Sequence, residues 1–230
     1  MRDVSFDVPE KQICGFIGPN GAGKTTLFSL ITGAFRPSSG KIHFRGNDVT
    51  GMDSARLVKK GVARTHQVVR PFRQLSVLEN VQLAVHYGRR AVVRTAAARE
   101  HAMESLKLVG LDRKANHLAA VLSLGEQKRL EVARALATAP ELILLDEICG
   151  GLNASETRAM MGLLQRIRET GATIMYVEHD MKAIMSICDR ITVLNFGQKL
   201  AEGKPEEIQN NPAVVEAYLG TSDLGSVPHA

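Results

Sequence analysis

The chain has 230 residues, of which 44% are hydrophobic and 23% charged, so its composition excludes a disordered chain, a collagen and a disulfide scaffold. A formal net charge of +5 suits a phosphate ligand, nucleic acid, an anionic membrane surface or ordinary solubility, but the scarcity of aromatic residues argues against a base-stacking nucleic-acid platform, and no nucleic acid is expected. No apolar stretch is long enough to span a bilayer, the first residues carry no signal run, and three scattered cysteines fit a reducing cytosol.

Strand and helix patterns alternate along the first third of the chain, which predicts an α/β fold with a parallel sheet. A buried strand is expected over 13–17, followed by a helix over 24–31. The turn-rich residues 41–51 predict a surface hairpin. Asp53 can cap a short helix that Gly61 ends.

The character of the sequence changes near residue 75. Ser76 and Glu79 have the spacing of a capping box that opens a helix to about Tyr87. A second helical pattern follows, with an apolar face formed by Ala98, Ala102, Leu106 and Val109. Four arginines (Arg89, Arg90, Arg94 and Arg99) give this region a basic run, which suits either a solvated helix face or lipid headgroups.

The α/β pattern returns after residue 122. Strands are expected over 142–145 and 173–177, with a helix over 154–170 between them. Residues 191–194 and 199–201 are expected to pair around a Phe-Gly turn, and a last helix is expected over 212–219. The predicted organisation is a single domain: 1–74 and 123–220 form a core with a β-subdomain, 75–122 a helical subdomain, and 221–230 a loose tail.

Residues 18–25 carry a phosphate-binding motif. Their sequence, Gly-Pro-Asn-Gly-Ala-Gly-Lys-Thr, matches the P-loop pattern between a predicted strand and a predicted helix. Its glycines let backbone N–H groups turn toward phosphate oxygens, and the helix N-terminus adds its positive end. Lys24 is expected to reach the β- and γ-phosphates, and the Thr25 hydroxyl to ligate Mg²⁺. The alternative is a glycine-rich turn that binds nothing.

Two further strand ends bring polar side chains to the same edge of the predicted sheet. The strands over 142–145 and 173–177 run into Asp-Glu and Glu-His-Asp sequences, and ligands of parallel sheets bind at the carboxyl ends of strands. We expect Asp146 to hold Mg²⁺ through water, Glu147 to act as general base, and His179 to bond a γ-phosphate or the attacking water. Helix capping by the acids and a structural histidine are the alternatives.

Residues 122–127 read Leu-Ser-Leu-Gly-Glu-Gln and precede a helix predicted over 128–137. Ser123 and Glu126 have capping-box spacing, so a well-capped helix is the simplest interpretation. A serine and a glycine at a helix N-terminus also form an anion site. On a lobe separate from the P-loop, that site could serve a partner's nucleotide.

Together these motifs resemble the ATP-binding subunit of an ABC transporter over essentially the whole chain. The P-loop, Gln67, the signature at 122–127, the acid pair at 146–147 and His179 occur in the family's order. Finer features resemble the ATPase of branched-chain amino acid importers, although a urea, amide or aromatic-acid importer remains open. These features are Ala63-Arg64-Thr65-His66-Gln67, the bulky third residue of the signature, Gly151-Leu152-Asn153 and the arginine-rich segment after Tyr87.

The resemblance implies a P-loop ATPase sheet core with a helical subdomain, ATP as substrate and Mg²⁺ as cofactor. Each ATP would lie between one subunit's P-loop and the signature of a second ATPase subunit, either identical or a paralogue. The implied nucleotide-binding residues are Asn20, Gly21, Ala22, Gly23, Lys24, Thr25, Thr26, Ser123, Gly125 and Gln127. Glu147, His179 and Gln67 would be catalytic, and Thr25, Gln67 and Asp146 would bind the metal.

The resemblance also implies two integral membrane permease subunits and, indirectly, an extracytoplasmic solute-binding protein. The chain would sit on the cytoplasmic face of the inner membrane, with the segment around Pro71-Phe72 near the permease. Leu152 and Asn153 would stand in the loop that links the two ATP sites. The solute would never touch this subunit, so its sequence does not name the solute.

Two departures from the family pattern stand out. Ile148 replaces the usual proline after the catalytic glutamate, which predicts a less rigid loop, and Cys149 beside it is either an oxidation point or an inert thiol. Val4-Ser5-Phe6 resembles the family's later strand, so the aromatic residue that stacks on adenine would precede Met1. We therefore expect an N-terminally shortened β-subdomain, weak ATP binding and little preference for adenine over guanine.

Other classes fit the sequence less well. A soluble ABC ATPase acting on ribosomes or DNA generally has two cassettes or a long coiled-coil insert, which this chain lacks. A P-loop kinase or GTPase would leave the signature unexplained, and the Asn-Lys-x-Asp motif that reads guanine is absent. A nucleotide-binding module inactivated by a missing N-terminus is opposed by the intact Lys24, Asp146, Glu147 and His179.

Overall fold

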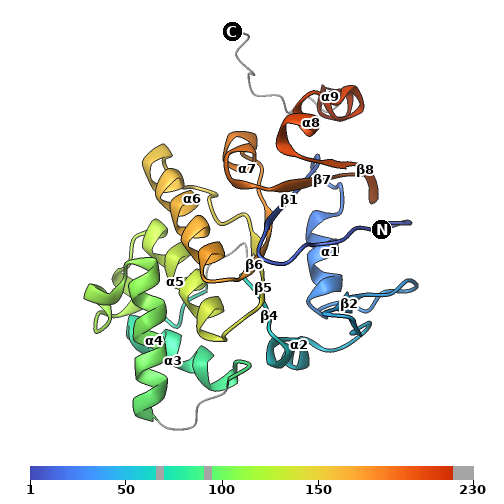
Figure 1. The fold of residues 1–230 in the computed structure, drawn as a ribbon. Coiled ribbons are helices and arrows are strands. Elements are labelled where there is room, and N and C mark those ends of the chain that lie inside the picture. Colours follow the sequence, from blue (N-terminus) through green and yellow to red (C-terminus); the bar gives the residue numbers. More distant parts are fainter. Residues whose placement is uncertain (66–69, 91–94, 220–230) are drawn as a thin grey trace.

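A six-stranded sheet runs through the computed structural model, which describes residues 1–65, 70–90 and 95–219 (Figure 1). In spatial order its strands are β4 (Val62–Arg64), β5 (Leu142–Asp146), β6 (Thr173–Val177), β1 (Ile13–Ile17), β7 (Arg190–Asn195) and β8 (Gln198–Gly203). Neighbouring strands are parallel except β7 and β8, which pair antiparallel around the predicted Phe-Gly turn. The predicted α/β class is therefore confirmed.

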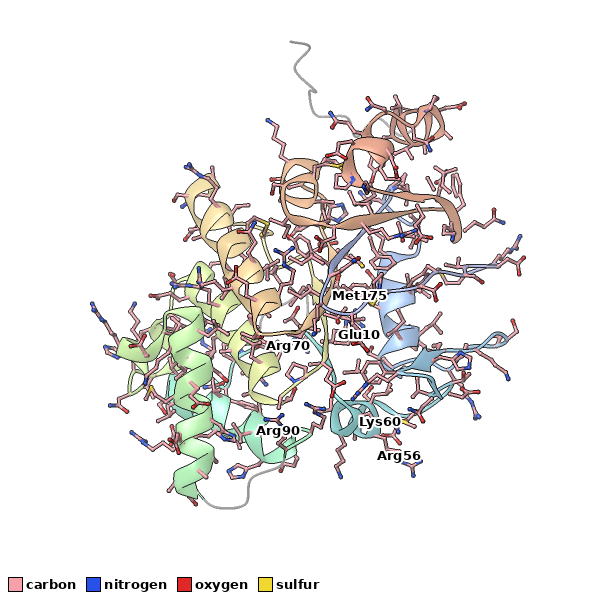
Figure 2. All side chains as sticks on the ribbon, viewed as in Figure 1. Glu10, Arg56, Lys60, Arg70, Arg90 and Met175 are labelled. Atoms are coloured by element: carbon pink, nitrogen blue, oxygen red, sulfur yellow. The ribbon has the colours of Figure 1, made fainter. Side chains whose placement is uncertain are left out.

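Side chains alternate along each strand, so apolar side chains lie on both faces of the sheet, and helices pack against each face. On β5, Ile143 and Leu145 pack into one apolar cluster, whereas Leu142 and Leu144 pack into the other. Figure 2 shows Met175 of β6 near the middle of the molecule, between the two layers of helices. Every residue of β1, β5 and β6 is buried, as expected for a parallel sheet with helices on both sides.

One face carries α1 (Lys24–Ile31), α2 (Ser54–Lys60) and a small hairpin of β2 (His43–Phe44) and β3 (Asn47–Asp48). The hairpin lies where the turn-rich sequence predicts it. Asp53 caps α2 by accepting a hydrogen bond from the Arg56 N–H, and Gly61 ends the helix in the left-handed region at φ 103°. Both end signals of α2 are thus confirmed.

The other face carries a helical layer made of α3 (Val77–Tyr87), α4 (Thr95–Val109) and α5 (Leu124–Ala137), which pack against one another. Two short 3₁₀ turns, η1 (Asp112–Lys114) and η2 (Ala119–Val121), connect α4 to α5. Buried side chains of all three helices belong to the same continuous core as those of β1 and β5. The subdomain boundaries at 75 and 122 stay a prediction.

The remaining helices are α6 (Ala154–Glu169), α7 (Met181–Ile187), α8 (Pro205–Gln209) and α9 (Pro212–Leu219). In Figure 1, α8 and α9 lie together beyond the β7–β8 edge, away from the helical layer. None of the helices in the described ranges has the length and apolar character needed to cross a membrane.

Several local expectations were wrong. Helix α5 begins at Leu124 rather than near residue 128, because the capping box of Ser123 starts it. Residues 4–6 form no strand; Phe6 instead packs edge-on against Phe16, with ring centroids 5.0 Å apart. Strand β4 and helices α7 and α8 had not been predicted, since elements this short have almost no periodicity.

One arginine of the basic run, Arg89, is neutralised by an ion pair with an acidic residue. The Arg89 guanidinium forms an ion pair with Glu141 and donates to the carbonyl of Ala139 at 3.1 Å. Arg90 and Arg99 are exposed, and Arg94 lies outside the described residues. The predicted loose tail at 221–230 lies outside them too.

Candidate nucleotide-binding and hydrolysis site

The register of the sheet places three polar segments side by side at one edge. Val177 is the strand partner of both Asp146 and Phe16. The residues at and just after these three positions therefore lie at the same carboxyl edge of adjacent strands. They are the acid pair on β5, the Glu-His-Asp sequence after β6 and the P-loop after β1, as predicted.

The conformation of the P-loop is fixed by a left-handed glycine and by hydrogen bonds from Lys24 to carbonyls of the loop. Gly23 adopts φ 101° and is the N-cap residue of α1, a left-handed conformation that favours glycine. Lys24 is buried, and its Nζ donates to the carbonyls of Gly18 and Pro19 at 2.6 and 3.1 Å. The lysine thus folds back over the loop where phosphates are expected. Burial lowers the pKa of Lys24, and the carboxylates of Glu147 and Asp146 oppose that shift.

Neighbouring elements fix the loop from outside. The N–H of Gly197, in the turn between β7 and β8, donates to the carbonyl of Ala22 at 3.0 Å. A backbone hydrogen bond joins Gly18 to the hydroxyl of Tyr218 on α9. Asn20, Gly21, Thr25 and Thr26 are exposed, as groups that meet a ligand from solvent must be.

Glu147 and His179 are in direct contact. Glu147 Oε1 and His179 Nε2 lie 2.6 Å apart, and the two side chains are 17% and 49% exposed. The pair therefore joins the end of β5 to the end of β6 at the open edge of the sheet. The carboxylate is oriented by a hydrogen-bonding partner, which is the arrangement expected for a general base.

Asp146 is buried and forms an ion pair with Arg64, in which Arg64 Nη2 lies 2.7 Å from Asp146 Oδ2. Within the described ranges, the buried Oδ1 of Asp146 has no hydrogen-bond partner. A buried carboxylate oxygen without a partner fits a magnesium site, because Mg²⁺ takes one or two protein oxygens together with water and phosphates.

Glu178 is a buried residue whose part the sequence did not reveal. Its carboxylate accepts hydrogen bonds from the backbone N–H groups of Cys149 and His179, at 2.6 and 3.2 Å. Burial raises the pKa of Glu178, and these two hydrogen bonds oppose the rise. Glu178 thereby connects the loop after Glu147 to the segment that carries His179.

The signature lies at the start of α5 and contacts a different part of the molecule. Ser123 and Glu126 form the predicted capping box, and the Gln127 Nε2 donates to the carbonyl of Leu122 at 2.8 Å. Gly125 is packed so closely that an added Cβ would lie 2.9 Å from Glu156 Oε1. No hydrogen bond or ion pair within the described ranges joins the signature to the P-loop.

One contact does link the signature helix to the hydrolysis site. Lys128 on α5 is buried, and its Nζ donates to the backbone carbonyl of Glu147 at 3.0 Å. Arg64, Lys128 and Glu178 contact residues of the candidate site, and sequence reasoning missed all three. Only tertiary contacts distinguish them from other charged residues. Gln67 lies outside the described residues, so its predicted role stays a prediction.

The fold and this edge of the sheet define the class as a P-loop ATPase. The family described as "ABC transporter" matches residues 1–150, and the family described as "Branched-chain amino acid ATP-binding cassette transporter" matches residues 198–223. The chain belongs to the ABC transporter family and is an ABC-type ATPase.

Individual proteins agree with this assignment. The chain is 42% identical to LivG of Salmonella typhimurium, a high-affinity branched-chain amino acid transport ATP-binding protein, over 96% of this chain and 91% of LivG. The ADP conformation of MJ1267, an ATP-binding cassette, superposes with a TM-score of 0.85 at 29% identity, covering 94% of this chain and 91% of that one. A dimeric cassette, MJ0796 bound to ADP and Pi, has a TM-score of 0.78 at 30% identity, with 88% and 89% covered.

Proposed function

We propose that this ABC ATPase powers the import of branched-chain amino acids through a membrane permease. The observation that carries the proposal is the meeting of the P-loop, the Asp146-Glu147 pair and His179 at one edge of the sheet. The likeness to LivG, at 42% identity over nearly the whole chain, supports the choice of solute. The alternative of a soluble ABC ATPase has no observation in its favour.

Binding is the task of the P-loop and α1. Lys24 exchanges the carbonyls of Gly18 and Pro19 for β- and γ-phosphate oxygens, while backbone N–H groups of the loop and of the start of α1 would surround the phosphates. The hydroxyl of Thr25 and the free Oδ1 of Asp146 are the oxygens that would hold Mg²⁺, Asp146 through water, with Gln67 as a further ligand. Bound Mg²⁺ would neutralise charge on the β- and γ-phosphates.

Hydrolysis is the task of Glu147 and His179. Glu147 takes the proton of the attacking water as the water oxygen approaches the γ-phosphorus. His179 Nε2, 2.6 Å from that carboxylate, orients Glu147 before the nucleotide binds and would then donate to the γ-phosphate instead. Lys24 stabilises the charge that spreads over the phosphate oxygens in the transition state. The bond to ADP breaks, and ADP and phosphate leave.

A second ATPase subunit completes the site. In the part of the chain that the structure describes, the signature residues Ser123, Gly125 and Gln127 form no hydrogen bond to their own P-loop, so they are available to the nucleotide on a partner. Val121 and Leu124, on either side of Ser123, are 64% and 46% exposed, which suits a surface that closes against another subunit. Closure would make hydrolysis depend on pairing.

The permease would contact the segment around Phe72. Phe72 is 50% exposed, with the Arg134 guanidinium 5.3 Å from its ring centroid, so an apolar side chain is presented to a neighbour beside a cation. Two integral membrane subunits would bind near this segment, at the cytoplasmic face of the inner membrane. An extracytoplasmic solute-binding protein would deliver the solute to them.

Solute uptake tests the proposal. In a strain that lacks the gene, uptake of labelled leucine, isoleucine and valine at low concentration should fall. The wild-type gene should restore uptake, and genes carrying Lys24→Ala or Glu147→Gln should not. A Glu169→Gln gene is the matched control, because this exposed carboxylate at the end of α6 lies outside the proposed site.

Two results would contradict the proposal. Unchanged leucine uptake with lost uptake of urea or an aromatic acid would move the chain to another importer. Co-purification of the Glu147→Gln chain with ribosomal proteins in ATP, rather than with two polytopic membrane proteins and an ATPase, would move it to the soluble class.

A further inference from the structure

Arg64 lies in a partly buried position beside the hydrolysis site, although the proposed mechanism gives it no role. It is the last residue of β4, three positions before Gln67. Its side chain is 13% exposed and pairs with the Asp146 carboxylate, which is 2% exposed. Removing two charges from water is costly, and the pair offsets that cost only if its remaining polar atoms are also satisfied.

A second arm of the same guanidinium reaches the P-loop helix. Arg64 Nη1 donates to the Ser29 hydroxyl at 3.1 Å, and that hydroxyl donates to the backbone carbonyl of Thr25 at 2.8 Å. The guanidinium carbon also lies 5.7 Å from the ring centroid of Phe28 on α1. Arg64 therefore spans the gap between β5 and α1, the two elements that carry Asp146 and Thr25.

The bonding within the ion pair is one-sided. Arg64 occupies Oδ2 of Asp146, whereas the buried Oδ1 has no hydrogen-bond partner within the described ranges. The Nε of Arg64 has none there either. A pair formed only to stabilise the fold would be expected to satisfy these groups. The free oxygen is explained if a ligand that the fold itself does not supply completes the carboxylate.

We infer that Arg64 is a positioning residue for the metal site: it holds Asp146 by Oδ2 so that Oδ1 faces Mg²⁺, and it fixes Thr25 through Ser29. The inference rests on the proposed function, because it takes Asp146 and Thr25 as metal ligands. A planar guanidinium suits this task, since it can bond two partners in fixed directions, and a lysine cannot. Groups of this kind orient metal ligands, and their loss typically weakens metal binding by about 10- to 100-fold.

Binding of ADP with and without Mn²⁺ tests the inference without turnover. The affinity for ADP is measured by calorimetry in EDTA and then in excess Mn²⁺, and the ratio reports how strongly the metal is held. Arg64→Gln should leave the affinity in EDTA near the wild-type value and reduce the gain from Mn²⁺ by about tenfold or more. Arg64→Lys keeps the charge but loses the planar guanidinium that bonds two partners, so the increase in its ADP affinity with Mn²⁺ should fall as well.

Controls separate the inference from the function on which it rests. Arg45→Gln removes a more exposed arginine from another ion pair, with Glu141, and should change neither affinity. Asp146→Asn should remove most of the gain from Mn²⁺. If Asp146→Asn keeps the full gain, the proposed metal site is wrong, whereas a full gain in Arg64→Gln alone overturns the positioning role.

Two further variants complete the test: one separates charge from geometry, and the other replaces Arg64→Gln if that variant does not fold. A wild-type gain in Arg64→Lys would show that only the charge matters and would also overturn the inference. If Arg64→Gln does not fold, Ser29→Ala replaces it, because this variant removes only the arm that reaches Thr25. A reduced gain from Mn²⁺ in Ser29→Ala supports the inference, and an unchanged gain overturns the part of it that links Arg64 to Thr25.

Discussion

Glu147 has the backbone conformation of a residue under constraint. Its φ of 50° lies in the left-handed region, which residues other than glycine rarely adopt. Its N–H donates to the carbonyl of Val177, and its own carbonyl accepts from Lys128 Nζ. The side chain is thus aimed at His179 by backbone contacts to β6 and α5. Because the aim is set before any nucleotide arrives, the carboxylate needs little reorganisation to act as a base.

Glu147→Gln tests the role of this carboxylate. Glutamine has the same shape but accepts no proton, so turnover of ATP should fall by about 10²- to 10⁴-fold, while the affinity for ATP stays near the wild-type value. Phosphate release and the binding of a fluorescent ATP analogue measure the two quantities. Normal turnover in Glu147→Gln would mean that another group is the base.

Cys149 lies two residues after Glu147, where an oxidisable thiol would matter most. The side chain is 7% exposed, and its Sγ lies 3.5 Å from the hydroxyl of Tyr176. Burial raises the pKa of the Cys149 thiol to about 12, against a smaller lowering by that hydrogen bond. The thiolate is the reactive form, so these surroundings favour the inert thiol over the oxidation point.

Alkylation should therefore leave Cys149 unmodified in the folded chain at pH 8. With a pKa near 12, the thiolate fraction at pH 8 is about 10⁻⁴, compared with about a quarter in the unfolded chain. The rate of alkylation should rise about tenfold per pH unit up to pH 10 without reaching a plateau. Iodoacetamide labelling and mass spectrometry, with a urea-unfolded control, measure both. Rapid labelling at pH 8 would contradict this.

Two helices of the helical layer begin in the same way, but we expect only one of the two helix starts to bind nucleotide. Ser76 opens α3 and Ser123 opens α5, each through a capping box with the glutamate three residues later. The hydroxyls accept from the N–H groups of Glu79 and Glu126 at 3.1 and 3.3 Å. The local geometry therefore does not distinguish the structural helix start from the proposed signature.

The matched pair Ser76→Ala and Ser123→Ala separates these roles. Each loses one cap, so each should lower the free energy of unfolding by about 1 kcal/mol. Only Ser123→Ala should also reduce ATP turnover, because only Ser123 would meet a partner's phosphate. Urea unfolding and steady-state hydrolysis measure the two effects. Equal turnover in both variants would reduce the signature to a helix cap.

Elements with local signals could be predicted from the sequence. The caps of α2 and α3, the hairpin and strands β1, β5 and β6 follow from turn residues and buried apolar runs. Strand β4 could not be predicted, because its three residues form a strand only by pairing with β5. Residues 4–6 show the reverse, since a strand-like sequence formed no pairing there.

The same division applies to the site. The P-loop, the acid pair and His179 could be found because each follows a strand, and parallel strands bring their ends together. The roles of Arg64 and Glu178 could not be assigned, although Arg64 lies in the segment before Gln67 and Glu178 directly precedes His179. Their roles depend on contacts with Asp146 and with the Cys149 backbone, and no local pattern encodes contacts across 82 or 29 residues.

At the scale of the whole molecule, the proposed active site is divided between two surfaces. The P-loop and Glu147 occupy the carboxyl edge of the sheet, whereas Ser123 begins α5, whose Gly125 packs beside Glu156 in the first turn of α6. Lys128 connects the two surfaces within one chain through the carbonyl of Glu147. Under this proposal a complete site needs a second copy or a paralogue, so pairing should depend on bound ATP.

ATP-dependent pairing is the prediction that tests this division. In Glu147→Gln with Mg²⁺ and ATP, the pair should form and persist, because nucleotide held between the P-loop and the partner's signature is not hydrolysed. With ADP the same chain should remain monomeric. Light scattering after size exclusion measures the mass.

Adding Ser123→Arg should abolish the pair without weakening ATP binding to the monomer, since the arginine would fill the partner's nucleotide space. A Glu147→Gln chain that stays monomeric with ATP would require a paralogue as the partner, and a mixed pair captured with that paralogue would show that the two surfaces come from different proteins.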